Sequence, residues 1–388
     1  MAILLNSNIT TSTLQSAIDA MEPFRDKAID LYSKDRENQK ALKAYKAAMD
    51  RIYASIHAKD EDSILLTSGN NEIISQLFLS FYLHYILTGR KNAIIIFERS
   101  SLPEIRAAKF LESQGCRIYR VPATIDGTID LEALKSYINS KTALLSLPLV
   151  DDESGVVQPL EEVSQICALH GVPLYANARD AMGRIPIDVQ RERVDYLSFE
   201  GSNIGGPKDI GALYIAKDAP ELIPTLFGSE SEQAGLRADI KDTANIIGFS
   251  KALESAVDSL DFEVEDIRDL RDDLEEGLLK ITDSYSLAPW ALRVPTVVIM
   301  AFAGVHGAML LDALADKKIL AYSFSSYLKG NFERKSLVEI ANLGSSLTHC
   351  TIGFSLSLGN TKEEIEEAIE IITTTVEEIR SNSACKGV

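Results

Sequence analysis

The chain has 388 residues, which exceeds the usual size of a single core, so a large domain and a smaller one are expected. A net charge of −18 argues against a general nucleic-acid binder, which needs a basic face, and against binding to anionic membranes. The scattered cysteines lack metal-ligand spacing, no basic leader precedes an apolar run, and no run could span a bilayer. These features predict a cytoplasmic protein without a metal site.

Short apolar runs alternate with longer amphipathic segments, the pattern of an α/β fold with a mostly parallel sheet flanked by helices. The expected strands are Ile94–Phe97, Arg117–Val121, Ala143–Leu147, Val172–Ala176, Ile210–Ile215 and Val297–Phe302. Helices are expected at Leu102–Gln114 and Leu160–His170, and one long helical stretch from about Ala244 to Ile281. The capping box Thr361–Glu364 begins a final amphipathic helix.

Ordered motifs along nearly the whole chain resemble those of the cysteine desulfurases, the NifS/IscS-like branch of the class V aminotransferases. The motifs are Leu65–Glu72 (LLTSGNNE), Val150–Pro159 (VDDESGVVQP), Ala176–Asp188 (ANARDAMGRIPID), Val194–Tyr214 (VDYLSFEGSNIGGPKDIGALY), Gly235–Ile240 (GLRADI), and Ile352–Leu356 (IGFSL) with Asn360–Glu364 (NTKEE). The resemblance implies the fold-type I architecture of enzymes that use pyridoxal phosphate (PLP). It predicts a large domain over residues 16–259 and a small C-terminal domain made of residues 1–15 and 260–388.

The resemblance also identifies replaced residues where the family holds its cofactor. Asn203 stands at the position of the lysine that forms a Schiff base with PLP, and Ser202 stands at the position of the preceding histidine. Asn177 replaces the aspartate that pairs with the pyridine nitrogen, and its spacing from Asn203 equals the family's, so no gap can bring a lysine into place. An asparagine amide neither forms the Schiff base nor abstracts a proton.

The ring and phosphate contacts differ as well. Arg99 takes the place of the ring-stacking histidine, and Asp152 and Asp180 replace amides that donate to the phenolic oxygen. Two carboxylates aimed at a phenolate repel it, by about a few kcal/mol each in a partly desolvated site. The phosphate-binding positions are occupied by Asn70, Asn71 and Ile240 in place of Ala, Thr and Thr.

Substrate handling is altered too. Gly353 replaces the arginine that grips the amino-acid carboxylate, a bidentate contact that glycine cannot make. Leu328 aligns with the persulfide cysteine, and no cysteine lies between Cys167 and Cys350. Cys385 is either a mobile sulfur acceptor or, as we prefer, an incidental cysteine in a polar tail.

The carboxylates of this region leave two interpretations open. Asp152, Asp180 and Glu153 could converge on a cation, or they could pair with Arg99 or Arg179 and fill the vacated pocket. We prefer the ion pairs, because buried charges require partners.

The sequence thus predicts a catalytically inactive cysteine desulfurase homologue that acts as an interaction, regulatory or scaffold subunit near iron–sulfur or sulfur-transfer chemistry. No covalent cofactor is expected and PLP itself is not expected, although noncovalent PLP or its amine form is left open. The expected partners are a second copy or an active paralogue in a dimer, and a sulfur-transfer or iron–sulfur assembly protein, with no nucleic acid and no membrane. The alternative is an enzyme, desulfurase-like or aminotransferase-like, whose pocket has been refitted for PLP or another small ligand.

Overall fold

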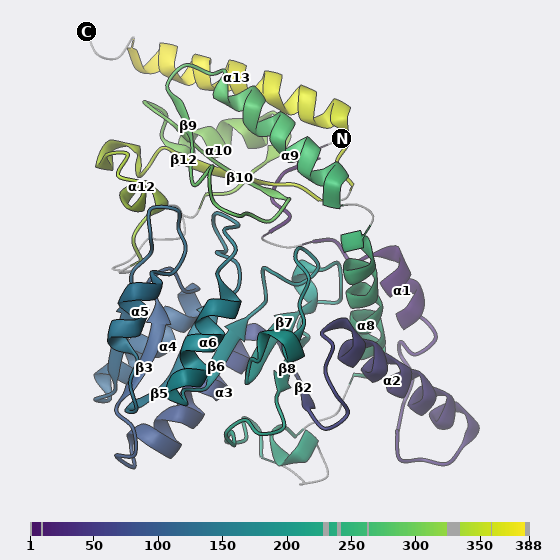
Figure 1. Ribbon diagram of the computed structural model, residues 1–388. Coiled ribbons are helices and arrows are strands. Elements are labelled where there is room, and N and C mark those ends of the chain that lie inside the picture. The colour runs from purple at the N-terminus through teal and green to yellow at the C-terminus, as the bar shows by residue number, and fades with distance from the viewer. Residues whose placement is uncertain are drawn as a thin grey trace.

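The computed structural model describes residues 2–8, 11–227, 233–238, 242–261, 264–323, 334–357 and 359–384. Figure 1 shows two bodies stacked on each other. The large-sheet body holds the seven-stranded sheet and its helices, and the small-sheet body holds the N-terminal strand and most of the C-terminal third. None of the helices in these described ranges is long and apolar enough to cross a lipid bilayer.

The large-sheet body is built on strands in the order β2-β8-β7-β6-β5-β3-β4. They are β2 (Ser63–Thr67), β3 (Ala93–Phe97), β4 (Arg117–Val121), β5 (Thr142–Pro148), β6 (Leu174–Asn177), β7 (Tyr196–Glu200) and β8 (Gly211–Ile215). Strands β4, β3, β5, β6 and β7 pair in parallel, whereas β8 runs antiparallel to both of its neighbours. Strands β3 and β5 are buried along their whole length, which explains their uninterrupted apolar runs. The predicted α/β class with a mostly parallel sheet is confirmed.

Helices cover this sheet. They are α1 (Gln15–Met21), α2 (Arg36–Ser55), α3 (Asn70–Phe81), α4 (Leu102–Ser113), α5 (Leu131–Tyr137), α6 (Leu160–His170), α7 (Val189–Glu192) and α8 (Thr243–Asp258). A π-helical turn, Tyr82–Ile86, continues α3, and a 3-10 turn, η2 (Gly201–Asn203), follows β7. Helices α1 and α2 both pack against α8 at one end of the sheet, on the right of Figure 1.

The small-sheet body contains an antiparallel sheet in the order β12-β10-β9 and a parallel pair, β1 with β11. Its elements are β1 (Ile3–Leu4), α9 (Val264–Leu279), β9 (Ser284–Ser286), β10 (Val297–Phe302), α10 (Gly307–Asp316), β11 (Ile319–Leu320), α12 (Leu337–Ile340), β12 (Thr351–Ser355) and α13 (Lys362–Ala384). Pairing with β11 places the N-terminal strand among C-terminal residues. The predicted domain boundaries, 16–259 against 1–15 with 260–388, stay a prediction.

The long helical stretch expected from Ala244 to Ile281 is two helices. Helix α8 ends at Asp258, a 3-10 turn spans Ser259–Asp261, and α9 begins at Val264. Each helix has its own packing partners: α8 contacts α1 and α2, and α9 contacts α13. The break therefore lies where the chain passes from one body to the other.

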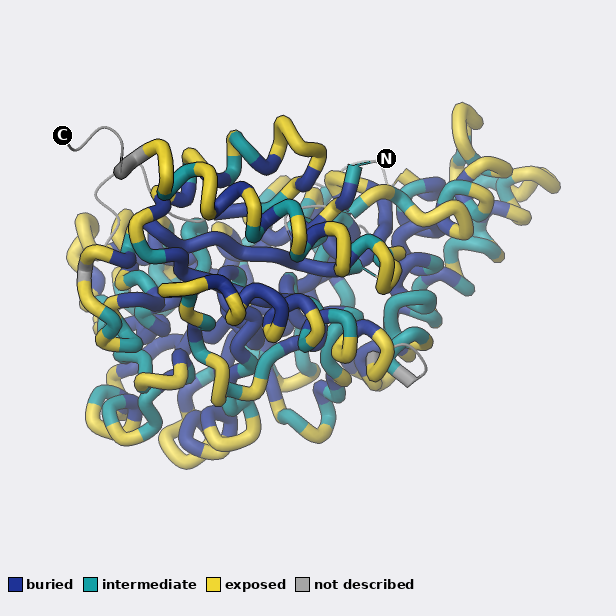
Figure 2. Tube along the Cα trace, turned by 90° about the horizontal axis from the view of Figure 1, so that it is seen from above, coloured by how far each residue is buried: buried dark blue, intermediate teal, exposed yellow. Residues whose placement is uncertain are grey.

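The carboxyl ends of the parallel strands meet at one edge of the sheet, and this edge faces the small-sheet body (Figure 1). Figure 2 shows the buried trace through the middle of the molecule and the exposed segments around its rim. In parallel α/β sheets this edge is where ligands bind. A ligand-binding site is therefore expected at the junction between the two bodies.

Candidate functional site

Most of the site residues expected from sequence lie at this edge. Arg99 follows β3, Asp152 follows β5, Asp180 follows β6, and Ser202 and Asn203 follow β7 in η2. Asn177 is the last residue of β6, and Asn70 is the first residue of α3. Asn71 is exposed on α3. Ile240, Leu328 and Cys385 lie outside the described residues.

Arg99 is at the centre of a buried ion-pair network, with only 1% of its surface exposed. Its guanidinium makes a two-point contact with Asp151, Nε to Oδ2 at 2.8 Å and Nη2 to Oδ1 at 3.0 Å. Nη2 also donates to Glu153 Oε2 at 2.8 Å, and Nη1 donates to Lys335 O at 2.7 Å. Burial alone would raise the pKa of Asp151, but Arg99 and Arg334 hold it well below its usual value.

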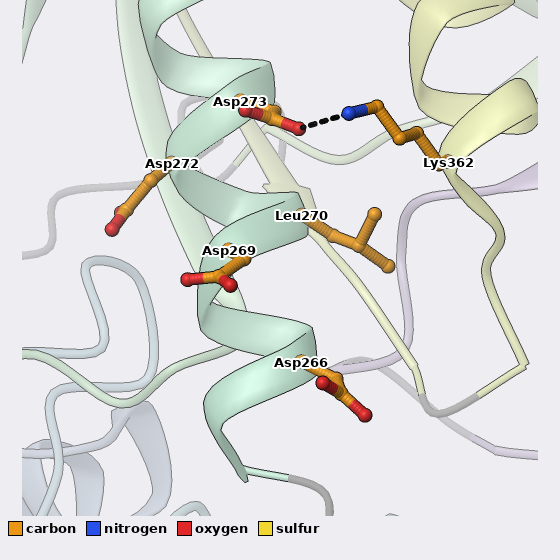
Figure 3. Close-up of a pocket in the computed structure, with 6 residues that line it drawn as sticks. All are labelled: Asp266, Asp269, Leu270, Asp272, Asp273 and Lys362. Carbon is orange, nitrogen blue, oxygen red and sulfur yellow. Dashed lines mark ion pairs between the residues drawn. The ribbon is translucent and has the colours of Figure 1, made fainter.

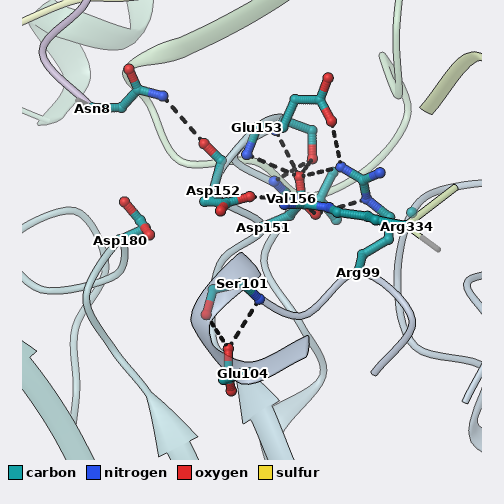
Figure 4. Close-up of polar contacts among 12 residues, drawn as sticks. Asn8, Arg99, Ser101, Glu104, Asp151, Asp152, Glu153, Val156, Asp180 and Arg334 are labelled. Atoms are coloured by element: carbon teal, nitrogen blue, oxygen red, sulfur yellow. Dashed lines mark hydrogen bonds and ion pairs between the residues drawn. The ribbon is translucent and has the colours of Figure 1, made fainter. Parts of the chain in front are cut away.

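Asp152 pairs with Arg334, which the sequence analysis did not identify. Arg334 Nη2 lies 2.5 Å from Asp152 Oδ1 and 3.1 Å from Asp151 Oδ2. Figure 4 shows both arginines converging on the Asp151–Glu153 turn. Asp152 therefore forms an ion pair as expected, but the expected partner, Arg99 or Arg179, is wrong. Its partner Arg334 belongs to the small-sheet body and is far away in sequence, so the motifs did not point to it.

Asn203 belongs to a second polar cluster. It is 5% exposed, and its Nδ2 donates to Asp180 Oδ1 at 3.1 Å. Arg179 Nη1 donates to both oxygens of Asp180 at 3.1 Å, as the preferred ion-pair interpretation expected. Burial raises the pKa of Asp180 despite this arginine. The position that the resemblance assigns to the family's lysine thus holds an amide that is hydrogen-bonded to a neighbouring carboxylate.

Glu200 is a member of this cluster that the sequence analysis overlooked. Its Oε2 accepts the backbone N–H of Asn70, at the N-terminus of α3, at 3.0 Å. Its Oε1 accepts from Arg179 Nε at 3.0 Å and from Ser202 Oγ at 2.7 Å. Burial opposes its ionisation, but Arg179 and these hydrogen bonds lower the pKa of Glu200. A carboxylate of the chain therefore occupies the anion-binding end of this helix.

Asn177 contacts a third buried carboxyl group, that of Glu104. Its Nδ2 donates to Glu104 Oε2 at 3.3 Å, and Ser146 Oγ donates to Glu104 Oε1 at 2.5 Å. Ser101 donates to Oε2 from both its backbone N–H and its hydroxyl, and the backbone contact is part of the capping box of α4. Burial raises the pKa of Glu104. The sequence signal that could have found this residue is the S-x-x-E capping pattern.

Gly353 lies on β12 directly against the ring of Tyr322. A Cβ atom built on Gly353 would lie 2.2 Å from Tyr322 Cζ, so any side chain at position 353 would require the tyrosine ring to move. The two residues also exchange backbone hydrogen bonds, and Tyr322 Oη donates to Glu153 O at 2.9 Å. The place expected to hold a substrate-binding arginine is therefore filled by a buried tyrosine.

A shallow acidic groove on α9 lies away from this site. Figure 3 shows Asp266, Asp269, Asp272 and Asp273 along the helix, and Lys362 Nζ lies 3.8 Å from Asp273 Oδ2. Within the described ranges, no group of three or more His, Cys, Asp or Glu side chains is arranged to hold a metal ion. The groove is an ordinary solvated helix face.

Comparison with known proteins gives consistent matches along the chain. The model of the family "Aminotransferase class-V" matches residues 3–368. A cysteine desulfurase IscS from Ehrlichia chaffeensis is 29% identical over 388 residues, covering 98% of this chain and 92% of that protein. Another, from Rickettsia massiliae, is 30% identical over 336 residues, covering 86% of this chain and 80% of that protein.

Solved structures show the same fold. A NifS-like protein superimposes with a TM-score of 0.89 at 23% identity, covering 97% of this chain and all of that one. A NifS-like protein from Rickettsia africae superimposes with a TM-score of 0.85 at 21% identity, again covering 97% of this chain and 100% of the other.

These matches correct the expectation about the cofactor. The statement that PLP is not expected is wrong, because the relatives are cysteine desulfurases, a PLP-dependent class of enzymes. Asn203 nevertheless offers an amide, which forms no Schiff base with PLP. Glu200 already accepts the backbone N–H at the N-terminus of α3, where an anionic group such as a phosphate would bind.

The order of motifs, the mostly parallel sheet and the matches over most of the chain all agree. The chain belongs to the class V aminotransferase family, in its NifS/IscS-like cysteine desulfurase branch.

Proposed function

We propose that this chain does not release sulfur from cysteine and instead acts as an interaction or regulatory subunit of sulfur-transfer or iron–sulfur chemistry. The observation that carries the proposal is the filled position at Gly353. The ring of Tyr322 takes the space in which an arginine would bind the carboxylate of an amino-acid substrate. Losing a bidentate, charge-assisted contact removes both binding energy and orientation of the substrate.

A second observation supports the proposal. At position 203 the family's lysine acts as a base, and an asparagine amide cannot titrate in its place. Asn203 is also held by its hydrogen bond to Asp180, so its amide is committed to the protein. The proposal concerns the reaction with cysteine and is independent of whether PLP is bound.

A third observation concerns the retained scaffold. The network of Arg99, Arg334 and the Asp151–Glu153 turn joins the two bodies through buried, well-formed ion pairs. Such a junction preserves the family's shape, and hence its surfaces, without needing the family's chemistry. This is why we infer a binding role, in a dimer with a second copy or with an active paralogue.

The catalytic part of the proposal is tested by sulfide release from L-cysteine, with added PLP, beside the Ehrlichia chaffeensis relative as positive control. We expect sulfide from the relative and only background from this chain. Sulfide release by this chain at a rate near that of the relative would overturn the proposal.

The interaction part is tested by mixing the chain with that active desulfurase. Native mass spectrometry reads the subunit composition, and the sulfide assay reads any change in the rate of the active enzyme. A mixed complex or a changed rate is expected if the partner is an active paralogue. If the chain forms a stable homodimer and leaves the sulfide-release rate of the relative unchanged, its interaction role is limited to the homodimer. If it stays monomeric and leaves that rate unchanged, the interaction part of the proposal is contradicted.

A further inference from the structure

A cavity of about 710 Å³ opens beside Asn203, where the two bodies meet. One wall is the N-terminal segment, which is bound to the turn after β7: Thr11 N donates to Ser202 O at 3.1 Å, and Leu14 N donates to Gly205 O at 2.8 Å. Gly205 has a φ of +71°, and Leu14 packs so closely on it that a Cβ there would lie 2.5 Å from Leu14 Cγ. The wall is therefore held in place by specific contacts, and the volume is in the range of small-molecule sites.

The lining combines apolar surface with hydroxyl groups. Leu14, Met182, Ile204 and Leu356 supply apolar side chains, and Thr11, Ser12, Ser16, Ser255 and Ser259 add hydroxyls. Two lining residues carry a formal charge, Arg184 within the cavity wall and Asp258, which is exposed. A ligand of this cavity would thus meet an apolar surface and one buried cation.

Arg184 is a buried cation with few partners. Its side chain is 9% exposed, its Nη1 donates to Asp180 O at 3.1 Å, and the nearest Asp180 carboxylate oxygen is 3.7 Å from Nη1. That carboxylate is closer to Arg179 and is also bonded to Asn203. Burial lowers the pKa of Arg184, although the charge of Asp180 opposes this shift. A guanidinium has five N–H donors, and an anion in the cavity would satisfy those that this contact leaves.

Thr296 gives a second, independent indication. It lines the same cavity, and its Oγ1 is buried with no hydrogen-bond partner among the residues that the structure describes. An unsatisfied buried hydroxyl costs about 1–3 kcal/mol, and a polar group of a ligand that reached Thr296 Oγ1 would offset this cost.

We propose that this cavity binds a small carboxylic acid with an apolar body, its carboxylate on Arg184 and its apolar part against Met182, Ile204 and Leu14. Arginine suits a carboxylate because its donors match the two oxygens. The inference goes beyond the proposed function, because it assigns a ligand class to the junction of the two bodies whatever the partner of the subunit.

Binding is measured by isothermal titration calorimetry with three probes of one chemistry: acetate, hexanoate and 3-phenylpropanoate. We expect the two larger acids to bind and 3-phenylpropanamide, which lacks the charge, to bind at least about tenfold more weakly. Arg184→Met is expected to weaken 3-phenylpropanoate by about tenfold or more, and Arg184→Lys by less. Arg191→Met removes an exposed arginine outside the cavity and is expected to change nothing.

Ser255→Phe leaves Arg184 intact and fills the cavity from α8. If Arg184→Met fails to fold, the loss of acid binding can therefore still be measured with this second variant. It is expected to abolish binding. Equal binding of the acid and the amide, wild-type affinity in Arg184→Met or Ser255→Phe, or no binding of any acid at millimolar concentration would each overturn the proposal. Sulfide release from cysteine would contradict the proposed function but leave this measurement standing.

Discussion

Tyr322 and Gly353 act as one unit at the scale of single residues. The tyrosine ring needs the space that a side chain at position 353 would take, and its hydroxyl is satisfied by Glu153 O. The resemblance to the family drew attention to Gly353 in the sequence, but nothing there pointed to Tyr322. Their contact explains why glycine is compatible with a fully buried strand position, where it would otherwise leave a void.

We expect Gly353→Arg to destabilise the protein by at least about 1–3 kcal/mol, because the new side chain cannot enter the space of the Tyr322 ring. Tyr322→Val should recover part of this loss in the double variant, and a double-mutant cycle from urea unfolding measures the coupling. If Gly353→Arg were as stable as the wild type, the steric argument would be refuted.

The buried carboxyl group of Glu104 should make the free energy of unfolding depend on pH. Its pKa is raised by burial in the folded state, so folding favours its protonated form. The stability that this group contributes is fully present below its unfolded pKa of about 4.3 and is lost as pH rises towards the higher folded value. The unfolding free energy of the wild type minus that of Glu104→Gln should therefore fall with rising pH above about pH 4.3.

Glu112→Gln, at an exposed position of the same helix, provides the baseline for this measurement. A difference between wild type and Glu104→Gln that stays flat from pH 4 to pH 8 would show that burial does not shift the group.

At the scale of elements, the N-terminus of α3 illustrates how one helix end is completed. Gly69 is the N-cap and offers no side chain, so the free backbone N–H of Asn70 is satisfied by Glu200 from the end of β7. Its φ of +139° makes glycine the residue suited to this cap. The helix dipole and Arg179 together stabilise the carboxylate there.

Glu200→Gln should cost about 1–2 kcal/mol of unfolding free energy, because the amide keeps the shape but loses the charge at the helix N-terminus and on Arg179. Glu132→Gln, in the exposed first turn of α5, should cost clearly less. Equal losses in the two variants, measured by urea unfolding, would contradict a special role for Glu200.

At the scale of the whole molecule, the two bodies are joined by buried charge. Arg334 and Lys335 O from the small-sheet body contact Asp151 and Arg99 of the large-sheet body, and Asn8 Nδ2 donates to Asp152 O. The junction combines three parts of the chain that are far apart in sequence. This network therefore fixes the geometry of the edge at which the candidate site lies.

Arg99→Met should destabilise the protein by about 3–5 kcal/mol, because it leaves Asp151 and Glu153 buried with less compensation. Hydrogen exchange should rise in residues 151–156 as the turn loosens. Lys135→Met, which removes the exposed pair with Glu132, should cost less than about 1 kcal/mol. A loss for Arg99→Met as small as this control would exclude a structural role for the network.

Much of the fold could be predicted from sequence because its signals are local. The apolar runs at Ile94–Phe97 and Ala143–Leu147 are buried strands, and the helix expected at Leu160–His170 has those bounds in the structure. Strand ends of a parallel sheet share an edge, so the motifs after the strands also predicted which residues gather there. The altered positions Asn177, Asp180 and Asn203 were identified from the resemblance to the family's motifs.

The sequence alone determined the fold class and the family, because hydrophobic periodicity and motif order can be read from consecutive positions, and its resemblance to the family also predicted which site residues are replaced. Only the tertiary structure decided the partners: Arg334 on Asp152, Tyr322 across Gly353, Glu200 at the end of α3, and Arg184 in the cavity. Each of these contacts joins segments that are far apart in the chain and come together only when the helices and strands pack. The spacing of residues along the chain does not predict which of these segments meet. The physical reason is that the burial of a side chain and the charges around it depend on tertiary contacts, which the order of residues along the chain does not show.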